Sequence, residues 1–139
     1  MKSRKGLIAE ADKWFSRYIR IRDTDAYGVG RCIDCGKPVT AVYADCGHFY
    51  SRRHLAVRWD EDNAHIQAKG CNYRMGEPEK NDGYRKRLIA KIGQERFDRL
   101  TIKKNNIAKF GNYELELIAA VYKEKTNFLL EKKMIEKWW

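Results

Sequence analysis

Four short motifs carry the most informative residues of this chain: Cys32-Ile33-Asp34-Cys35, Asp45-Cys46-Gly47-His48, Asn63-Ala64-His65 and Cys71-Asn72. All four carry side chains that bind metals, and they fall between residues 32 and 72. The middle positions are spaced regularly, with 15 positions from His48 to Asn63 and 9 from Asn63 to Asn72. A histidine can accept a proton near neutral pH, and carboxylate and amide oxygens suit a hard divalent cation. The pattern therefore predicts a metal site assembled from several segments.

The order and spacing of the motifs resemble those of HNH nucleases, which cut DNA in a ββα-metal fold. Hydrolysis of a phosphodiester needs a base for the attacking water and a cation that stabilises the developing charge. We therefore expect His48 to be the general base, with Asp45 and Asn72 as ligands of a catalytic Mg²⁺ or Mn²⁺. Asn63 belongs to the same catalytic motif and is expected to brace the hairpin against the helix. His65 is expected to be structural or to support the site from behind.

Each of these residues has a simpler interpretation when it is taken alone. A histidine that follows a glycine at a strand end is usually a surface residue, and an asparagine before a helix is usually an N-cap. The shared spacing, together with the cysteine knuckle, favours catalysis. His54 lies among arginines and is expected to be a surface residue.

The cysteines predict a structural zinc ion beside the catalytic motif. Cys32 and Cys35 form half of a zinc site, and tetrahedral zinc takes four ligands. Cys71 is the expected third ligand, but a second Cys-x-x-Cys is incomplete because position 68 is Ala68. Cys46 is the candidate fourth ligand. The alternative is that zinc is lost and the cysteines are buried thiols.

Strand geometry bears on the choice of fourth ligand. In a regular strand Cys46 and His48 share one face and Asp45 lies on the other. A bulge at Gly47 would turn Cys46 toward the knuckle and bring Asp45 to the side of His48. We therefore predict a bulge at Gly47.

The composition favours a polyanionic partner. The chain of 139 residues has a formal net charge of +10, with 29 Lys and Arg against 19 Asp and Glu. Such an excess suits DNA, although it also suits a merely soluble basic surface. The cations closest to the motifs are the candidate phosphate contacts: Arg52, Arg53, Arg58, Lys69 and Arg74.

The predicted fold class is α+β, with an HNH ββα-metal core, a brace that resembles a zinc knuckle, and flanking α-helices. A single domain, 1–139, would comprise an N-terminal helical segment (1–30), the core (31–77) and C-terminal helices (78–139). Within it we expect a helix over about 7–22, a hairpin over 31–50 with a strand from 39 to 50, and a basic loop over 51–61. Apolar spacing predicts a helix around Tyr84 and Leu88 that ends at Gly93, a short one over 94–100 and a last one from Gly111. No run of 18 apolar residues and no signal peptide are seen, so neither a membrane partner nor secretion is expected, and a cytoplasmic location follows.

The motifs also resemble the phage NinG/Rap recombination family. The resemblance is carried by Cys32-Ile33-Asp34-Cys35-Gly36, Asp45-Cys46-Gly47-His48-Phe49-Tyr50-Ser51-Arg52, Arg58-Trp59-Asp60-Glu61-Asp62-Asn63-Ala64-His65-Ile66-Gln67 and Cys71-Asn72, and it extends to Gly76 and to residues 92–95. It implies a phage or prophage nuclease in the host cell that cuts branched recombination intermediates such as D-loops and Holliday junctions. Ala68 departs from the family, which usually has Cys there.

Two other functions remain open at this stage. The first is a zinc-knuckle module that binds DNA without catalysis. The second is an HNH nuclease of the restriction, homing or packaging type, which would cut linear duplex or a fixed site. A homodimer is also an open alternative.

Overall fold

The structure is a computed structural model that describes residues 2–74 and 82–139. Its helices are α1 (Arg4–Arg22), η1 (Leu55–Val57, a 3₁₀ turn), α2 (Lys69–Arg74), α3 (Asp82–Ile92), α4 (Gln94–Lys104) and α5 (Asn112–Lys132). Its strands are β1 (Val29–Arg31), β2 (Pro38–Thr40), β3 (Asp45–His48) and β4 (Ala64–Gln67). This mixture of helices and small antiparallel pairs confirms the α+β class. The predicted end of the core, from Gly76 to residue 77, lies outside the described residues.

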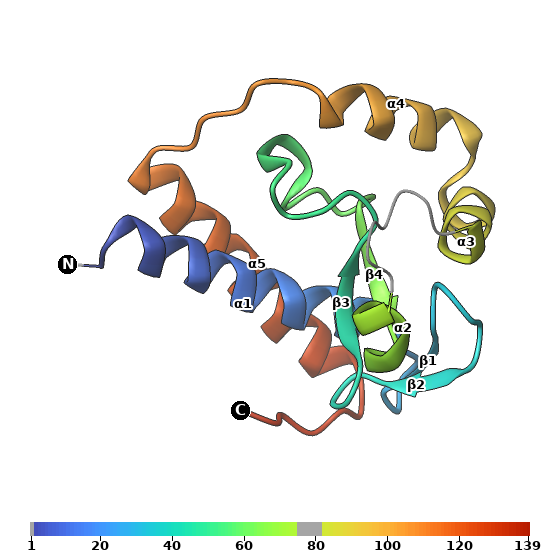
Figure 1. The fold of residues 1–139 in the computed structure, drawn as a ribbon. Coiled ribbons are helices and arrows are strands. Elements are labelled where there is room, and N and C mark those ends of the chain that lie inside the picture. The colour runs from blue at the N-terminus through green and yellow to red at the C-terminus, as the bar shows by residue number, and fades with distance from the viewer. Residues whose placement is uncertain (1, 75–81) are drawn as a thin grey trace.

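Helices α1 and α5 lie side by side, although they come from opposite ends of the sequence (Figure 1). Phe15 and Ile19 of α1 are buried against Leu115 and Tyr122 of α5, and the rings of Phe15 and Tyr122 meet edge to face with centroids 4.9 Å apart. Helix α1 begins earlier than predicted because Ser3 caps it, with the Ser3 hydroxyl accepting from the Gly6 amide at 3.1 Å. This helix pair forms the base on which β3 and β4 rest.

The strands form two separate antiparallel pairs, β1 with β2 and β3 with β4. The prediction of one strand from 39 to 50 is wrong, because β2 ends at Thr40 and a turn over residues 41–44 leads into β3. Arg20 of α1 explains this turn. Its guanidinium donates to the carbonyls of Ala41 at 3.2 Å and Ala44 at 3.3 Å, and both alanines are buried.

The predicted bulge at Gly47 is also wrong. Strand β3 pairs with β4 without interruption, with Gly47 opposite His65 and His48 opposite Ala64. The glycine is needed for a different reason, since a Cβ atom at position 47 would lie 2.1 Å from Oε1 of Gln67. A larger residue at position 47 would therefore require the Gln67 side chain to move.

Helices α3 and α4 cover a second core. Phe49 and Tyr50, which follow β3, pack with Tyr84 of α3 and Phe97 of α4. The Tyr84 hydroxyl donates to the Gly47 carbonyl at 2.6 Å and ties α3 to the strand.

The helices at this end largely match the sequence prediction. Helix α3 ends at Ile92 before Gly93, which takes a φ of 90°, as the sequence predicts. Helix α4 extends to Lys104, beyond the predicted end at residue 100. Helix α5 begins after Gly111 as predicted.

Helix α5 presents two apolar faces with different surroundings. Leu115, Ala119 and Tyr122 are buried against α1, whereas Leu117 and Phe128 are exposed. Over the described residues, no helix is both long and apolar enough to cross a lipid bilayer.

Candidate functional site

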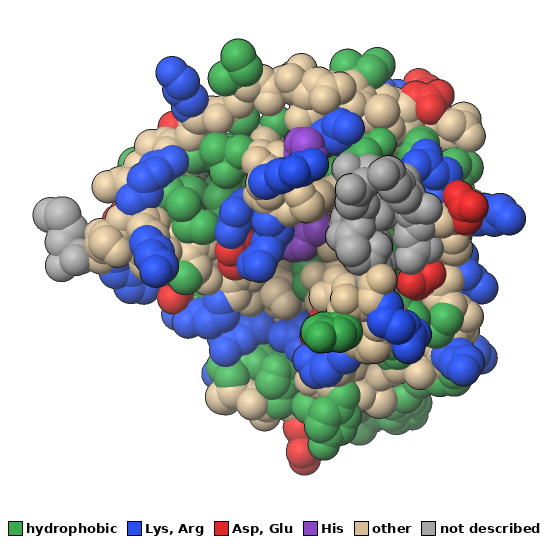
Figure 2. Space-filling model, viewed as in Figure 1, with side chains coloured by type: hydrophobic (Ala, Val, Ile, Leu, Met, Phe, Trp, Pro, Cys, Tyr) green, Lys and Arg blue, Asp and Glu red, His purple; other side chains and the backbone are tan. Residues whose placement is uncertain are grey.

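A pocket with a cavity volume of about 490 Å³ opens between α1, β3 and α2. Its lining joins predicted and unpredicted residues: Asp12, Ser16, Arg20, Ala44, Asp45, Cys46, His48, Ser51, Arg52, Lys69 and Asn72. Pockets of this size are typical of ligand sites. On the face shown in Figure 2, Lys and Arg side chains lie on several sides of the histidines that reach the surface. The pocket thus brings His48, Asp45 and Asn72 together, as their spacing predicts.

His48 is held at one ring nitrogen. Its Nε2 lies 2.9 Å from the carbonyl oxygen of Arg58, and because a carbonyl can only accept, Nε2 carries the proton. The neutral ring then leaves the lone pair on Nδ1. Phe15 of α1 packs beside the ring, with centroids 6.0 Å apart. The arrangement provides a fixed imidazole with one basic nitrogen.

The surroundings keep His48 neutral. Desolvation in the half-buried site lowers the pKa of His48 to about 4, and the nearby charge of Arg52 lowers it further, while the hydrogen bond to Arg58 opposes the shift. The ring is therefore unprotonated at neutral pH and can accept a proton.

Asp45 and Asn72 meet at the edge of the pocket. The Asn72 side-chain amide donates to Oδ2 of Asp45 at 3.0 Å, and the Lys69 ammonium lies 2.7 Å from Oδ1. Both carboxylate oxygens thus face donors from α2. A carboxylate, an amide that can present its oxygen after rotation, and room for water form the oxygen-rich set that Mg²⁺ prefers.

Asn63 lies behind the pocket and does not line it. The residue is fully buried, its Oδ1 accepts from the Tyr50 amide at 2.9 Å, and its Nδ2 donates to the carbonyls of Tyr50 at 2.9 Å and Val57 at 3.0 Å. These bonds close the loop over residues 50–63. Asn63 therefore braces the loop and not, as expected, the hairpin against the helix, and its buried side chain does not line the pocket.

His65 lies in a buried charge network on β4. Its Nε2 donates to the Asp62 carbonyl at 2.8 Å, and its Nδ1 faces the cationic nitrogens of Lys91 at 2.8 Å and Arg22 at 3.2 Å. Burial, followed by the charges of Lys91 and Arg22, lowers the pKa of His65 to about 3. Asp23 completes the network by binding both cations.

Some of the predicted phosphate contacts are exposed, whereas others are held by neighbouring side chains. Arg52 lines the pocket with 59% of its side chain exposed, and Arg53 is also exposed. Arg58 is a correction, because its side chain is only 19% exposed and Asp12 holds it in a two-pronged ion pair. Arg74 lies outside the pocket lining, with its guanidinium 3.9 Å from the Cys71 sulfur.

Sequence reasoning missed the contribution of α1. Asp12, Ser16 and Arg20 recur at four-residue steps and form one wall of the pocket. Residues at this spacing lie on one helix face. A polar stripe beside the apolar stripe of the helix was the available signal.

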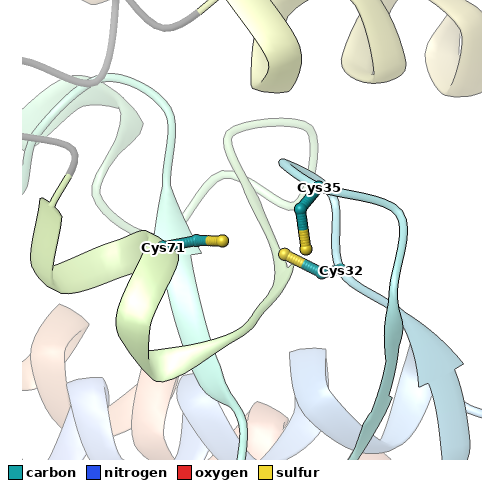
Figure 3. Close-up of side chains that lie close together, drawn as sticks. All are labelled: Cys32, Cys35 and Cys71. Atoms are coloured by element: carbon teal, nitrogen blue, oxygen red, sulfur yellow. The ribbon is translucent and has the colours of Figure 1, made fainter.

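The cysteine cluster lies outside the residues that line this pocket. The sulfurs of Cys32, Cys35 and Cys71 point toward one another, all within 4.8 Å (Figure 3). Thiolates that share one zinc ion are about 3.8 Å apart, because each Zn–S bond is about 2.3 Å. The cluster can therefore bind a metal ion such as zinc.

Backbone amides also favour thiolates here. The amide of Ala68 donates to the Cys32 sulfur at 3.2 Å. The amide of Lys37 is the main cause of a lowered pKa at Cys35. Desolvation, and then the neighbouring sulfurs, raise the pKa of Cys71 to about 12. The pKa values of Cys35 and Cys71 are therefore shifted in opposite directions.

Cys46 is not the fourth ligand that the sequence suggested. Within the described residues, the group of possible metal ligands contains Cys32, Cys35 and Cys71 and does not include Cys46. The regular strand keeps Cys46 on the side of His48, where it lines the pocket and packs against α1. Desolvation raises the pKa of Cys46 to about 12, so this thiol stays protonated at neutral pH.

The family profile described as Bacteriophage Lambda NinG protein matches residues 1–133. The chain belongs to the NinG family. Proteins named "Protein ninG" from Escherichia phage 933W and Enterobacteria phage VT2-Sa are each 32% identical over 127 residues, which cover 90% of this chain and 59% of the relative. The corresponding protein of Escherichia phage lambda is also 32% identical over 127 residues, covering 90% of this chain and 58% of the relative.

The matched relatives are longer than this NinG chain, which spans about three fifths of their length. No solved structure matches the chain. The resemblance to the NinG family predicted from the motifs is confirmed.

Proposed function

We propose that this NinG chain is a metal-dependent DNA endonuclease of the HNH type, and that it acts in phage recombination on branched DNA such as D-loops or Holliday junctions. One observation carries the proposal. His48 is fixed by the Arg58 carbonyl in a pocket that also holds Asp45 and Asn72, and among residues 2–74 and 82–139 its basic Nδ1 accepts no hydrogen bond. The order β3, β4, α2 in the chain suits a ββα-metal core.

The proposed role of His48 is to take a proton from the attacking water. General-base help of this kind is typically worth ~10²–10⁴-fold. A ring with a pKa of about 4 is a weak base in the free protein. A bound phosphodiester places negative charge beside the ring, and this raises the pKa of His48 toward neutrality. The products expected are a 5′-phosphate and a 3′-hydroxyl.

Asp45 and Asn72 would hold the catalytic Mg²⁺ or Mn²⁺, and their oxygens fit such an ion. When bound, the ion would neutralise charge on the phosphate and the leaving oxygen. The Lys69 ammonium now occupies Oδ1 of Asp45 at 2.7 Å, so it would have to give way. Lys69 would then be free to contact DNA.

The exposed cations would guide the DNA backbone to the pocket. Arg52 stands at its rim, and Arg53 follows it on the same loop. Guanidinium groups bind phosphate oxygens through paired hydrogen bonds. Such contacts supply affinity without choice of sequence.

Cleavage of matched substrates tests the proposal. Linear duplex, flap, D-loop and four-way junction DNAs of equal length would be incubated with the protein and Mg²⁺, Mn²⁺ or EDTA. We expect the protein to nick branched DNA in the presence of Mg²⁺ or Mn²⁺. EDTA should abolish this activity, and the His48→Ala variant should not show it. Equal cutting of the linear duplex would favour the restriction, homing or packaging type of HNH nuclease instead.

The cysteine cluster favours a second candidate function, a zinc-knuckle module that binds DNA without cutting it. Three sulfurs that converge within 4.8 Å can hold a zinc ion that clamps β1 and β2 to α2. We propose one zinc ion per chain, with the fourth ligand contributed from outside the group of three cysteines. Metal analysis of protein purified without chelator tests this. DNA binding without metal-dependent nicking would support the module over the nuclease.

A further inference from the structure

Asp12 connects helix α1 to the loop that holds the candidate base. Its Oδ2 accepts from Nη2 of Arg58 at 2.6 Å, and its Oδ1 accepts from Nε of Arg58 at 3.0 Å and from the indole nitrogen of Trp59 at 3.0 Å. Three hydrogen bonds from two consecutive residues thus converge on one carboxylate. Both partners of the ion pair are only 19% exposed, so water weakens the pair less than it weakens a surface pair.

One of these two residues, Arg58, also contacts the His48 ring. The carbonyl that accepts from Nε2 of His48 at 2.9 Å belongs to Arg58, whose side chain Asp12 holds. With the guanidinium and the adjacent indole both fixed, that carbonyl has little freedom to move. The chain of contacts therefore runs from Asp12 through Arg58 to His48.

We infer that Asp12 is a positioning residue for His48, which acts through the Arg58 carbonyl to fix the orientation of the imidazole and the proton on Nε2. The inference deepens the proposed nuclease function and rests on it for its effect on cleavage. Displacing a catalytic group by about 1 Å can cost ~10²-fold in rate. Loss of Asp12 leaves the guanidinium of Arg58 and the indole of Trp59 without this acceptor, so the loop is expected to shift.

The contacts of Asp12 argue against a direct role as a metal ligand. Its two oxygens already accept three hydrogen bonds, and Arg52 adds a cation at 3.5 Å from Oδ2. Asp45, by contrast, accepts hydrogen bonds from Lys69 and Asn72 of the short helix α2. Arg58 and Trp59 therefore already occupy both oxygens of the Asp12 carboxylate.

Glu10 offers a matched control on the same helix. Its carboxylate also accepts from an indole, that of Trp14 at 3.1 Å, and pairs with Lys13 at 3.0 Å. None of these partners belongs to the loop that holds His48. Glu10→Ala thus removes a comparable set of contacts from α1 without reaching the site.

The first test is kinetic and uses nicking of a four-way junction with Mg²⁺. Asp12→Ala should lower kcat roughly 10²-fold with little change in KM or in the Mg²⁺ concentration for half-maximal rate. Asp12→Glu should recover part of the loss, and Glu10→Ala should cleave at the parental rate. A raised Mg²⁺ requirement in Asp12→Ala would make Asp12 a metal ligand and overturn the inference, as would an unchanged kcat.

The second test needs neither DNA nor metal. Long-range ¹⁵N–¹H NMR of the histidine rings should show His48 as the Nε2–H tautomer in the parent and in Glu10→Ala. In Asp12→Ala the signal should change to a mixture of tautomers, while unfolding curves report whether the variant is folded. If Asp12→Ala does not fold, Asp12→Asn replaces it, since an amide keeps the acceptor at Oδ1 and removes the one at Oδ2. A single unchanged tautomer in the folded variant overturns the inference even if the protein cuts no DNA.

Discussion

His48 and His65 lie on paired strands within the same hairpin, yet their surroundings prepare them for different work. Each ring donates from Nε2 to a backbone carbonyl, of Arg58 for His48 and of Asp62 for His65. The difference lies at Nδ1, which faces Lys91 and Arg22 in His65, whereas in the described part of the chain no cation is bonded to Nδ1 of His48. A base needs a free lone pair, and only the His48 ring lines the pocket.

The cations around the two rings differ in the same way. Beside His65, Arg22 and Lys91 both bind Asp23, at 2.8 and 2.9 Å. Beside His48, Arg52 keeps 59% of its side chain exposed. A histidine within such a motif can therefore act as a base only when its neighbours leave one ring nitrogen able to accept a proton.

The largest expected effect separates the two histidines by cleavage. His48→Ala should reduce metal-dependent nicking by ~10²–10⁴-fold, because the proposed base is lost while few core contacts change. Affinity for a four-way junction, measured in EDTA, should stay near that of the parent. Nicking by the variant at the parental rate would remove His48 from the mechanism.

The sequence identified much of this site because its signal is local. The spacing of Asp45, His48 and Asn72 predicted a meeting that the pocket confirms. The cysteine pattern likewise located Cys32, Cys35 and Cys71 in one cluster. Short motifs of this kind are readable because each carries its chemistry in a few consecutive residues.

Other parts of the site depend on contacts between distant segments. In the sequence Arg58 looks like a cation that is free to bind phosphate. In the structure it pairs with Asp12 of α1, and no rule of sequence spacing links the two residues. A role for Cys46 as a zinc ligand requires a bulge at Gly47, but β3 pairs regularly with β4 and the glycine lies close to the Gln67 side chain. Tertiary packing decided both cases.

The second effect concerns the free energy of unfolding, which should fall more when His65 is replaced than when His48 is replaced. His65→Ala removes a fully buried ring and takes one acceptor from Arg22 and Lys91, and a hydrogen bond to a charged group contributes about 1.5–3 kcal/mol when it is buried. Urea unfolding should therefore show a larger loss of unfolding free energy for His65→Ala than for His48→Ala. Equal losses in the two variants would show that the network around His65 is not specially stabilising.

The third effect concerns acid. The pKa of His65 is about 3 in the folded protein against an ordinary value of 6.5, so the unfolded chain takes up a proton at a higher pH than the fold does. Stability is full above the unfolded pKa and falls as the pH drops from about 6.5 toward 3. Asp23 does not contribute in the upper part of this window. Burial opposes its ionisation, but Arg22, Lys91 and His65 together lower the pKa of Asp23 to about 2.

Unfolding curves at pH 7, 6 and 5 would isolate the histidines. In the parent, the free energy of unfolding should fall over this range, and His65→Gln should make the fall shallower because that residue no longer titrates. His48, with a pKa of about 4, should leave part of the slope in the variant. The same slope in parent and variant would mean that His65 titrates alike in the folded and unfolded chains.

The smallest expected effect tests whether the cations beside His48 are open to DNA. Arg52→Ala combined with Arg53→Ala should weaken binding to all duplex sequences alike, and each lost phosphate contact should reduce the log–log salt slope by about 0.9. Arg96→Ala is the matched control, since Arg96 is an exposed arginine that binds Asp62 near the other histidine. Its slope should equal that of the parent, because Arg96 is not among the residues that line the pocket. If the double variant also keeps the parental slope, the arginines at the pocket rim do not contact phosphate, and DNA must reach His48 along another surface.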